Sequence, residues 1–394
     1  MWQRYPRSIY LAALIAGLLL CASVLFTSCT QAESGSATAM ASADNLRINQ
    51  VQVVGTHNSY KLPIDPELFT LLREKMGPRL DGLDYSHLPM PQQLSLGLRN
   101  LEIDVVYDPE GGRYADPYGL RLLKQMGKSA AEYDAEKMRK PGLKVIHVPD
   151  MDFRSQVYTF REALQQLKDW SDANPRHLPV VITMNAKDAS IDNPDFVKLL
   201  PFDQAAWDSW DAEIREILPP AKLITPDDIR GSYDTLEHAV QAHNWPTIGA
   251  ARGRFLFVLD ERGEKFKSYA EGHPSLQGRV MFGNAPVGTP EAAFLILNDP
   301  DRQFQEIQHR VRSGYMVRTR ADAETKEARS GDRSRMEAAF ASGAQVVTTD
   351  YPKEDPRFGT GYRVALPGDG YVRWNPLLLP VARPLPDLDD AKSN

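Results

Sequence analysis

The feature that most constrains the fold is a series of eight short apolar runs, each carrying polar residues at or near its end. Amphipathic stretches such as SQVYTFREALQQLKDWSDA and RSRMEAAFASG separate several of them. The runs are residues 51–60, 98–107, 143–148, 178–185, 254–260, 280–284, 314–322 and 344–351. Strands that alternate with helices pair in parallel through right-handed crossovers. Eight strands over roughly 300 residues predict an α/β fold, a (β/α)8 TIM barrel in a single catalytic domain.

The N-terminus predicts export. Arg4 and Arg7 precede an apolar run that ends in LFTSC, which is typical of a signal segment. This ending resembles a bacterial lipobox, in which Cys29 would become the lipidated first residue of a membrane-anchored lipoprotein. The alternative is ordinary cleavage after a small residue further on, which would leave the protein periplasmic or secreted.

Length and charge limit the rest. The 394 residues are enough for one large core, and a formal net charge of −6 argues against a nucleic-acid binder. Both cysteines, Cys21 and Cys29, lie in the signal, so the mature domain has no disulfide or thiolate chemistry. We expect a monomer. The expected organisation is an export signal (1–29), a flexible tether (30–46), the barrel domain (47–365) and a proline-rich C-terminal tail (366–394).

The ends of these runs indicate a metal site. The C-terminal ends of parallel barrel strands meet on one face, where active sites are built. Glu102 and Asp104 are two apart on one strand and therefore point to the same side. Two inward carboxylates repel unless a cation joins them, and oxygen ligands suit Ca²⁺ or Mg²⁺. Taken alone, two carboxylates at this spacing are more readily explained by solvent exposure or an arginine partner. His57, Asn58 and His147 at neighbouring strand ends favour the metal.

The two histidines indicate acid–base chemistry. His57 and His147 lie on different runs, which suits cleavage of a phosphodiester. One histidine accepts a proton from the attacking hydroxyl and the other donates one to the leaving oxygen. The remaining histidines are expected to be structural, although His87 follows the first run closely enough to line the rim.

Cationic side chains on the last strands are candidates for phosphate binding. Arg318 and Arg320 share a strand face, and the planar arginine fork matches phosphate oxygens. The alternative is an ion pair with Asp322 or Asp350. The candidate substrate-binding residues are Lys187, Arg318, Arg320 and Tyr351.

The motifs GTHNSY, LEIDV, VIHV and PVVITMNAKD together resemble the bacterial calcium-dependent, phosphatidylinositol-specific phospholipase C family. The resemblance continues through GYMVRTRAD to VVTTDYP. It implies attack by an inositol 2-hydroxyl on phosphorus, departure of diacylglycerol, and a cyclic inositol phosphate that water later opens. The positions carried over are His57 and His147 as catalytic histidines and Asn58, Glu102 and Asp104 as calcium ligands.

One position departs from the pattern. Eukaryotic relatives place a glutamate ligand where this chain has Asn185, whose amide oxygen binds Ca²⁺ with less charge. The predicted cofactor is therefore Ca²⁺, with Mg²⁺ as the alternative.

Two other functions stay open at this stage. A glycerophosphodiester phosphodiesterase or a sphingomyelinase D-like enzyme would use the same barrel, and the E-x-K pattern of the former would place Asn185 and Lys187 in matching positions. A non-catalytic lipid-binding lipoprotein is the third possibility, because a fold alone does not give function. The expected partners are a phospholipid or glycerophosphodiester substrate and a membrane surface.

Overall fold

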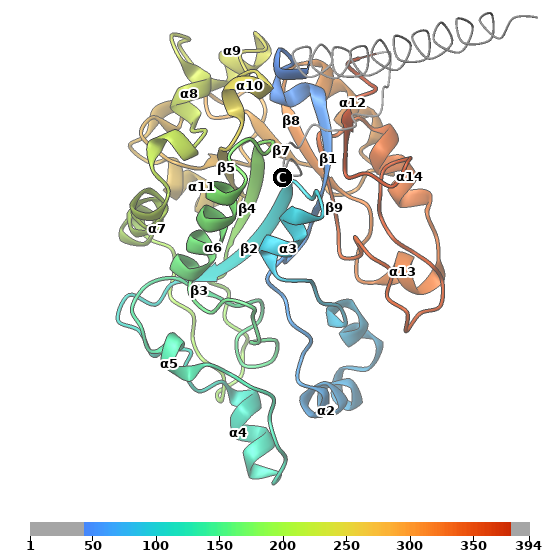
Figure 1. Ribbon diagram of the computed structural model, residues 1–394. Coiled ribbons are helices and arrows are strands. Elements are labelled where there is room, and N and C mark those ends of the chain that lie inside the picture. The colour runs from blue at the N-terminus through green and yellow to red at the C-terminus, as the bar shows by residue number, and fades with distance from the viewer. Residues whose placement is uncertain (1–42, 380–394) are drawn as a thin grey trace, which may run out of the picture.

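Eight parallel strands form one nearly closed barrel in the computed structural model, which describes residues 43–379 (Figure 1). Their order is β6-β5-β4-β2-β1-β9-β8-β7. The predicted (β/α)8 barrel is confirmed. The barrel strands are β1 (Val51–Thr56), β2 (Asn100–Val106), β4 (Val180–Ala186), β5 (Phe255–Leu259), β6 (Phe282–Gly283), β7 (Phe294–Ile296), β8 (Met316–Arg320) and β9 (Val346–Thr349).

Helices surround the barrel and also fill its longer loops. The α-helices are α2 (Pro66–Met76), α3 (Met90–Ser95), α4 (Tyr118–Gln125), α5 (Ala135–Met138), α6 (Phe160–Ala173), α7 (Gln204–Ile217), α8 (Pro226–Arg230), α9 (Leu236–Gln241), α10 (Ile248–Ala251), α11 (Gly263–Ala270), α12 (Phe304–Arg312), α13 (Lys326–Ser330) and α14 (Ser334–Ala341). Within residues 43–379, none of the helices has the length and apolar character needed to cross a bilayer. The predicted export signal and Cys29 lie outside the described residues.

The barrel has one seam, a place where two neighbouring strands share no ladder of backbone hydrogen bonds. Across the described chain, every neighbouring pair of barrel strands is hydrogen-bonded except β6 and β7. The side chain of Asn284, just after β6, spans this seam. Its Oδ1 accepts a hydrogen bond from Ile296 N at 3.1 Å, and its Nδ2 donates to Asp260 Oδ1 at 3.3 Å. A strand-end side chain thus ties β5, β6 and β7 together at the C-terminal ends of the strands.

Two of the sequence expectations for strands are corrected. The run 143–148 is not a barrel strand, because only β3 (Lys144–Val145) is extended, and it pairs antiparallel with the end of β2. That edge of β2 is open because β1 pairs with β2 only at Gly55 and Asn100. The eighth barrel strand is instead β7, a three-residue element that was not predicted from the sequence.

The first strand is held closely on both sides. A Cβ on Gly55 would lie 2.3 Å from Asn100 Cβ and 2.5 Å from its carbonyl oxygen, so only glycine allows this approach. Beyond it, the ladder to β9 continues as His57 N donates to Thr349 O at 3.1 Å. Near its start, β1 also pairs with β10 (Val372–Trp374), an antiparallel strand from the C-terminal part of the chain.

An apolar cluster supports the loops beyond the C-terminal ends of the first strands. Helices α2, α4 and α5 lie beyond the C-terminal ends of β1 and β2 (Figure 1). They pack through buried residues such as Leu68, Leu123 and Met138, and the same cluster includes Ile146 and Phe153. The segment that carries His147 is therefore anchored by this cluster, although it is not part of the barrel.

Candidate active site

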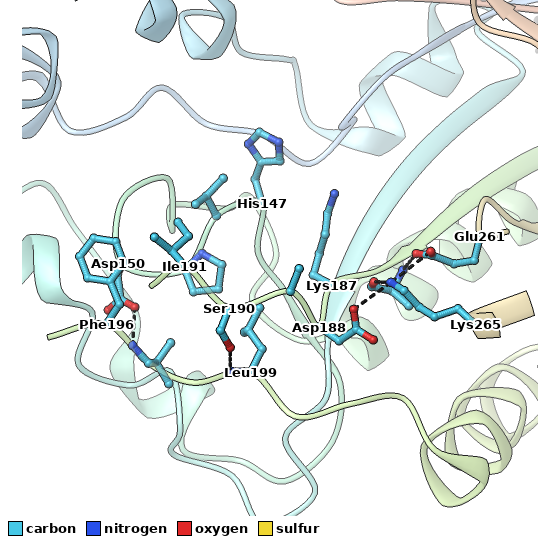
Figure 2. Close-up of a pocket in the computed structure, with 15 residues that line it drawn as sticks. His147, Asp150, Lys187, Asp188, Ser190, Ile191, Phe196, Leu199, Glu261 and Lys265 are labelled. Atoms are coloured by element: carbon cyan, nitrogen blue, oxygen red, sulfur yellow. Dashed lines mark hydrogen bonds and ion pairs between the residues drawn. The ribbon is translucent and has the colours of Figure 1, made fainter. Parts of the chain in front are cut away.

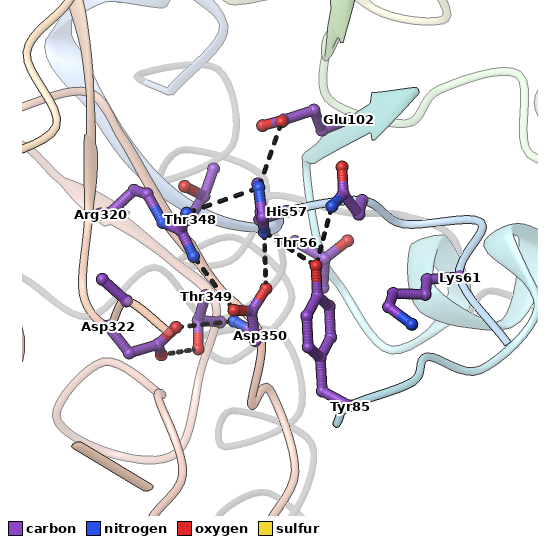
Figure 3. A network of polar contacts seen from close by, with 12 residues as sticks. Thr56, His57, Lys61, Tyr85, Glu102, Arg320, Asp322, Thr348, Thr349 and Asp350 are labelled. Carbon is purple, nitrogen blue, oxygen red and sulfur yellow. Dashed lines mark hydrogen bonds and ion pairs between the residues drawn. The ribbon is translucent and has the colours of Figure 1, made fainter. Parts of the chain in front are cut away.

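His57 lies at the end of β1 with its ring held between two acidic side chains (Figure 3). Its Nδ1 is 2.8 Å from Asp350 Oδ1, and its Nε2 is 3.6 Å from Glu102 Oε1. Asp350 follows β9, whose carbonyl at Thr349 accepts the His57 amide, so parallel pairing alone brings the two side chains together. Because a carboxylate accepts, Nδ1–H donates to Asp350 and Nε2 carries the free lone pair.

Burial and a nearby cation keep this histidine neutral. Burial lowers the pKa of His57 to about 3, with a further contribution from the Arg320 guanidinium and opposition from Asp350. Arg320 Nη1 lies 3.4 Å from His57 Nε2. A guanidinium can only donate, so Nε2 is the acceptor in this contact, and a neutral imidazole that accepts at Nε2 is the form that a general base requires.

Asp350 and Arg320 form the ion pair that was the alternative to phosphate binding. Arg320 Nη2 donates to Asp350 Oδ2 at 3.0 Å. Burial would raise the pKa of Asp350, but His57 and Arg320 together hold it below its usual value. Asp322 lies next to Asp350, and its Oδ1 accepts a hydrogen bond from Asp350 N at 2.9 Å. Burial, and then the Asp350 charge, raise the pKa of Asp322 to about 7.

Glu102 and Asp104 are both buried on β2 and face the same side, as their spacing predicted. Each meets a cation: Arg318 forms a close ion pair with Glu102, and Lys187 Nζ lies 2.9 Å from Asp104 Oδ2. Asn185 Nδ2 donates to Glu102 Oε1 at 3.2 Å. Burial raises the pKa of Glu102 to about 7, with Arg318 opposing and Asp104 adding to the shift.

The donor atoms around this pair fit a calcium or magnesium ion. Asn58 Oδ1 is buried and has no hydrogen-bond partner, while Asn58 Nδ2 donates to Tyr85 Oη at 2.8 Å. Asp104 Oδ1 likewise has no hydrogen-bond partner, and Lys187 Nζ pairs with Asp104 Oδ2. Within residues 43–379 no three histidine, cysteine or acidic side chains gather as a metal cluster. The predicted ligand set does not require one, because two of its four members are asparagines.

His147 repeats the arrangement of His57 on the other side of the site. It follows β3, and its Nδ1 is 2.8 Å from Asp152 Oδ2. Asp152 is fully buried and also pairs with Lys61 Nζ at 2.9 Å. Burial would raise the pKa of Asp152, but Lys61 and His147 outweigh it and hold the pKa below its usual value. The Nε2 of His147 is left free to exchange a proton.

A continuous chain of contacts joins the two histidines. Tyr85 Oη is 3.2 Å from His57 Nδ1, and Lys61 Nζ lies 5.1 Å from the centroid of the Tyr85 ring. Lys61 then reaches Asp152 and, through it, His147. His87, expected near the rim, is buried behind the site, where its Nε2 is 2.8 Å from the carbonyl oxygen of His57. The two histidines are thus fixed in one network.

The structure places the remaining predicted residues differently. Arg318 Nη1 donates to Asn298 Oδ1 at 2.7 Å in addition to pairing with Glu102, so it belongs to the acidic centre. Tyr351 is buried against Phe358 and Tyr362, and its hydroxyl has no hydrogen-bond partner. The geometry gives Tyr351 a packing role, and its contact with substrate stays a prediction.

Several residues of this network were missed from sequence. They are Lys61, Tyr85, Asp152, Asn298 and, as a partner of His57, Asp350. Two signals were available: Asp350 ends a strand run, and Asp152 follows His147 by five positions. Nothing local marks Lys61 or Tyr85, because their roles depend on tertiary contacts.

The barrel and its strand-end site, with two carboxylate-held histidines beside an acidic pair, define a TIM-barrel hydrolase. The family model described as "Phosphoinositide phospholipase C, Ca2+-dependent" matches residues 46–376. The chain therefore belongs to this family of phosphodiesterases, and the resemblance noted from the motifs is confirmed.

Three bacterial enzymes are among the solved structures with a similar fold. A calcium-dependent phosphoinositol-specific phospholipase C from Pseudomonas sp. (apo form, myoinositol complex) has a TM-score of 0.48 and 15% identity, covering 84% of this chain and 96% of that one. The Streptomyces antibioticus Ca²⁺-dependent enzyme has a TM-score of 0.48 and 18% identity, covering 77% and 95%. The phosphatidylinositol-specific phospholipase C of Listeria monocytogenes has a TM-score of 0.43 and 12% identity, covering 80% and 93%. Comparison with curated proteins gives no match.

Proposed function

We propose that the protein cleaves phosphatidylinositol-like lipids to diacylglycerol and a cyclic inositol phosphate in a calcium-dependent reaction. One observation carries the proposal. Two histidines each contact a buried carboxylate through Nδ1, and the site also holds the acidic pair of β2. Oxygen atoms without hydrogen-bond partners are also present there as possible metal ligands. Such an arrangement can accept one proton and donate another in general acid–base catalysis at a phosphoryl group.

His57 is assigned the role of base. Its neutral Nε2 takes the proton from the inositol 2-hydroxyl, whose oxygen then forms the new bond to phosphorus. The imidazolium that results is stabilised by Asp350, 2.8 Å from Nδ1. The bond from phosphorus to the glycerol oxygen breaks, and His147 donates a proton to that oxygen. Asp152 fixes the His147 ring so that Nε2, not Nδ1, faces the leaving group.

Charge on the phosphoryl oxygens is balanced by cations. Asn58, Glu102, Asp104 and Asn185 would hold Ca²⁺, and the ion bound there would offset phosphoryl charge. Lys187 pairs with Asp104 and Arg318 with Glu102, so both cations lie at this acidic centre. We assign them to orientation of the phosphate, since guanidinium and ammonium groups bind its oxygens.

Product analysis tests the proposal. Purified protein is incubated with phosphatidylinositol and, separately, with glycerophosphoinositol, in calcium, magnesium or chelator. Cyclic inositol phosphate and diacylglycerol from the lipid, lost on chelation, are the expected products. Free glycerol phosphate would instead identify a glycerophosphodiesterase, a cyclic phospholipid would identify a sphingomyelinase D-like reaction, and no product would leave a lipid-binding protein.

Substitution of the histidines tests the mechanism. His57→Ala and His147→Ala are each expected to lower kcat by about 10³-fold or more, because acid–base groups contribute about 10²–10⁴-fold. His309→Ala, at an exposed site on α12, is the matched control and should keep wild-type turnover. If either active-site variant turns over normally, the two-histidine mechanism is wrong.

We also propose that the chain is exported and anchored in a bacterial membrane through a lipidated Cys29. The support is the charged N-terminus, the apolar run and the LFTSC ending. Expressed in a bacterium, the wild type should sediment with membranes, and Cys29→Ser should release it into the soluble fraction. Equal distribution of the two forms would rule out lipid anchoring.

A further inference from the structure

The hydroxyl of Tyr85 contacts both a predicted calcium ligand and the proposed base. Asn58 Nδ2 donates to Tyr85 Oη at 2.8 Å. His57 Nδ1 lies 3.2 Å from the same oxygen, and Figure 3 shows the hydroxyl directed toward the His57 ring. An amide nitrogen can only donate, and Nδ1 carries the hydrogen that it directs to Asp350. Tyr85 Oη is therefore the acceptor in both contacts.

The hydrogen bond to Tyr85 sets the direction of the Asn58 amide. The oxygen and nitrogen of the amide lie on different branches of one plane, so fixing Nδ2 also fixes Oδ1. Asn58 is buried, and its Oδ1 has no hydrogen-bond partner among residues 43–379. The Asn58 φ of 47° lies in the left-handed region, which asparagine adopts more readily than most residues. Because Ser59 N donates to Glu102 O at 2.8 Å, this oriented amide lies beside the acidic strand.

Tyr85 does not line the cavity at the other side of the site. That cavity, of about 390 Å³, lies beside His147 and Lys187, between the segments after β3 and β4 (Figure 2). Tyr85 borders a different cavity, of about 830 Å³, which lies between the segments after β1 and β9 and shares none of the same lining residues. The contacts of its hydroxyl thus make Tyr85 a positioning residue, which acts through Asn58 and His57.

Two ion pairs on the preceding residue hold Tyr85 in place. Asp84 Oδ2 accepts from Arg329 Nη2 at 2.8 Å, and Asp84 Oδ1 accepts from Arg357 Nη1 at 2.7 Å. Arg329 belongs to α13, and Arg357 lies in the segment after β9. Phe358 packs against both arginines, whose guanidinium carbons lie 4.5 and 5.6 Å from its ring centroid. Segments that follow the first and the last two barrel strands therefore meet at Asp84 and fix the position of Tyr85.

We propose that the Tyr85 hydroxyl orients Asn58 toward calcium and, through the same oxygen, holds the His57 ring in place for its role as base. The inference rests on the proposed function, in which Asn58 is a calcium ligand and His57 accepts the proton. It adds a dependence between metal binding and turnover. Because one oxygen contacts both side chains, loss of this hydroxyl should impair the two together, whereas a tyrosine that only packs in the fold would affect stability alone.

Tyr85→Phe tests the proposal, because it removes the hydroxyl and keeps the ring. The calcium Kd of the purified protein, measured by calorimetric titration without substrate, should rise about three- to tenfold, as expected for the loss of one hydrogen bond. The kcat at saturating calcium should fall by a similar factor. Asp84→Asn keeps the hydroxyl but weakens the two ion pairs, so it should raise Kd by about twofold.

Tyr269→Phe is the matched control. Tyr269 is fully buried on α11, and its Oη accepts from Met281 N and donates to Asp211 Oδ1, each at 3.0 Å. The same substitution there removes a buried hydroxyl that also accepts an N–H. It should lower the midpoint of urea unfolding and leave the calcium Kd and kcat at their wild-type values. A general loss of stability therefore does not imitate the expected result.

A double-mutant cycle shows whether Tyr85 acts through Asn58. In the Asn58→Ala background, Tyr85→Phe should change the calcium Kd by less than about twofold, because the oriented ligand is already absent. An unchanged Kd for Tyr85→Phe alone, or the same loss in both backgrounds, would overturn the inference while the proposed function stands. A raised Kd with unchanged kcat would overturn the part that concerns His57. Absence of calcium binding by the wild type would overturn both the inference and the proposed function.

Discussion

His57 Nδ1 and Asp350 Oδ1 lie 2.8 Å apart, although 293 positions separate the two residues in the chain. The first and last barrel strands are neighbours, and each presents one partner at its C-terminal end. The carboxylate selects the tautomer in which Nε2 is the acceptor. Arg320 occupies the second oxygen of Asp350, so the carboxylate cannot turn away from the ring.

Asp350→Asn should impair catalysis far more than folding. An amide at this position can donate to Nδ1 and so stabilise the wrong tautomer, and it cannot stabilise an imidazolium. We expect kcat to fall by about 10³–10⁴-fold, as for the equivalent change in other carboxylate-oriented histidines. Steady-state kinetics measures this, and Asp355→Asn on the following loop, where Asp355 pairs with Arg357, is the control. A variant that retains a tenth of wild-type kcat would show that Asp350 does not orient His57.

Asp322→Asn should stabilise the protein at alkaline pH. The folded protein holds the Asp322 proton up to about pH 7, whereas the unfolded chain loses it near pH 4. The wild type therefore loses stability as pH rises from about 4 through 7, and the amide, which cannot ionise, does not. The variant should exceed the wild type by about 1–3 kcal/mol at pH 8 and match it at pH 4. Urea unfolding at both pH values measures the difference. The exposed Asp301→Asn should follow the wild-type curve, and a variant less stable at pH 8 would refute the expectation.

Lys61→Met should destabilise the fold strongly. Lys61 and Asp152 are both fully buried and 2.9 Å apart, so removal of the ammonium leaves a buried carboxylate with only His147 to meet it. Breaking such a pair costs about 3–5 kcal/mol. Chemical denaturation gives the free energy of unfolding. Lys128→Met, which breaks the exposed pair with Glu67, should cost less than about 1 kcal/mol, and similar losses for the two variants would contradict the expected role of burial.

Asn185→Asp should tighten calcium binding. The change adds a formal charge beside Glu102, to which Asn185 now donates at 3.2 Å. Charge count is one of the quantities that sets Ca²⁺ affinity, so we expect Kd to fall about tenfold in calorimetric titration. Asn58→Ala should raise Kd, because it removes the unpartnered Oδ1. Asn193→Asp, whose side chain bonds to Asp195 N, adds the same charge elsewhere and should leave Kd unchanged. No difference between Asn185→Asp and this control would exclude Asn185 from the ligand set.

The strand-end residues were predictable because the barrel obeys simple periodicity. Glu102 and Asp104 share a face through the two-residue repeat of β2, and His57 extends β1 toward the same face. These inferences needed only the direction of parallel strands, which the alternation of strands and helices supplies.

The errors occurred where short elements depend on tertiary contacts. The run around His147 reads as a strand, but its β3 portion is only a two-residue addition to β2, stabilised by the cluster that contains Ile146. β7 has three residues, too few to show an alternation of apolar and polar side chains. Lys61 could not be recognised as a buried partner of Asp152, because the two are 91 positions apart and nothing in the local sequence marks Lys61.

The pairing of β1 with β9 and β10 sets an order for assembly. β1 is the first barrel strand to be synthesised, yet residues 346–349 and 372–374, which complete its two edges, are among the last of the described chain. A nascent polypeptide that stops before residue 346 has neither of these strands, and Asp350 is also missing. Contacts this distant in sequence form late, since loop closure has to precede them. His57, the proposed base, is consequently positioned only when nearly the whole polypeptide is present, and a prematurely terminated product should carry an incomplete, inactive centre.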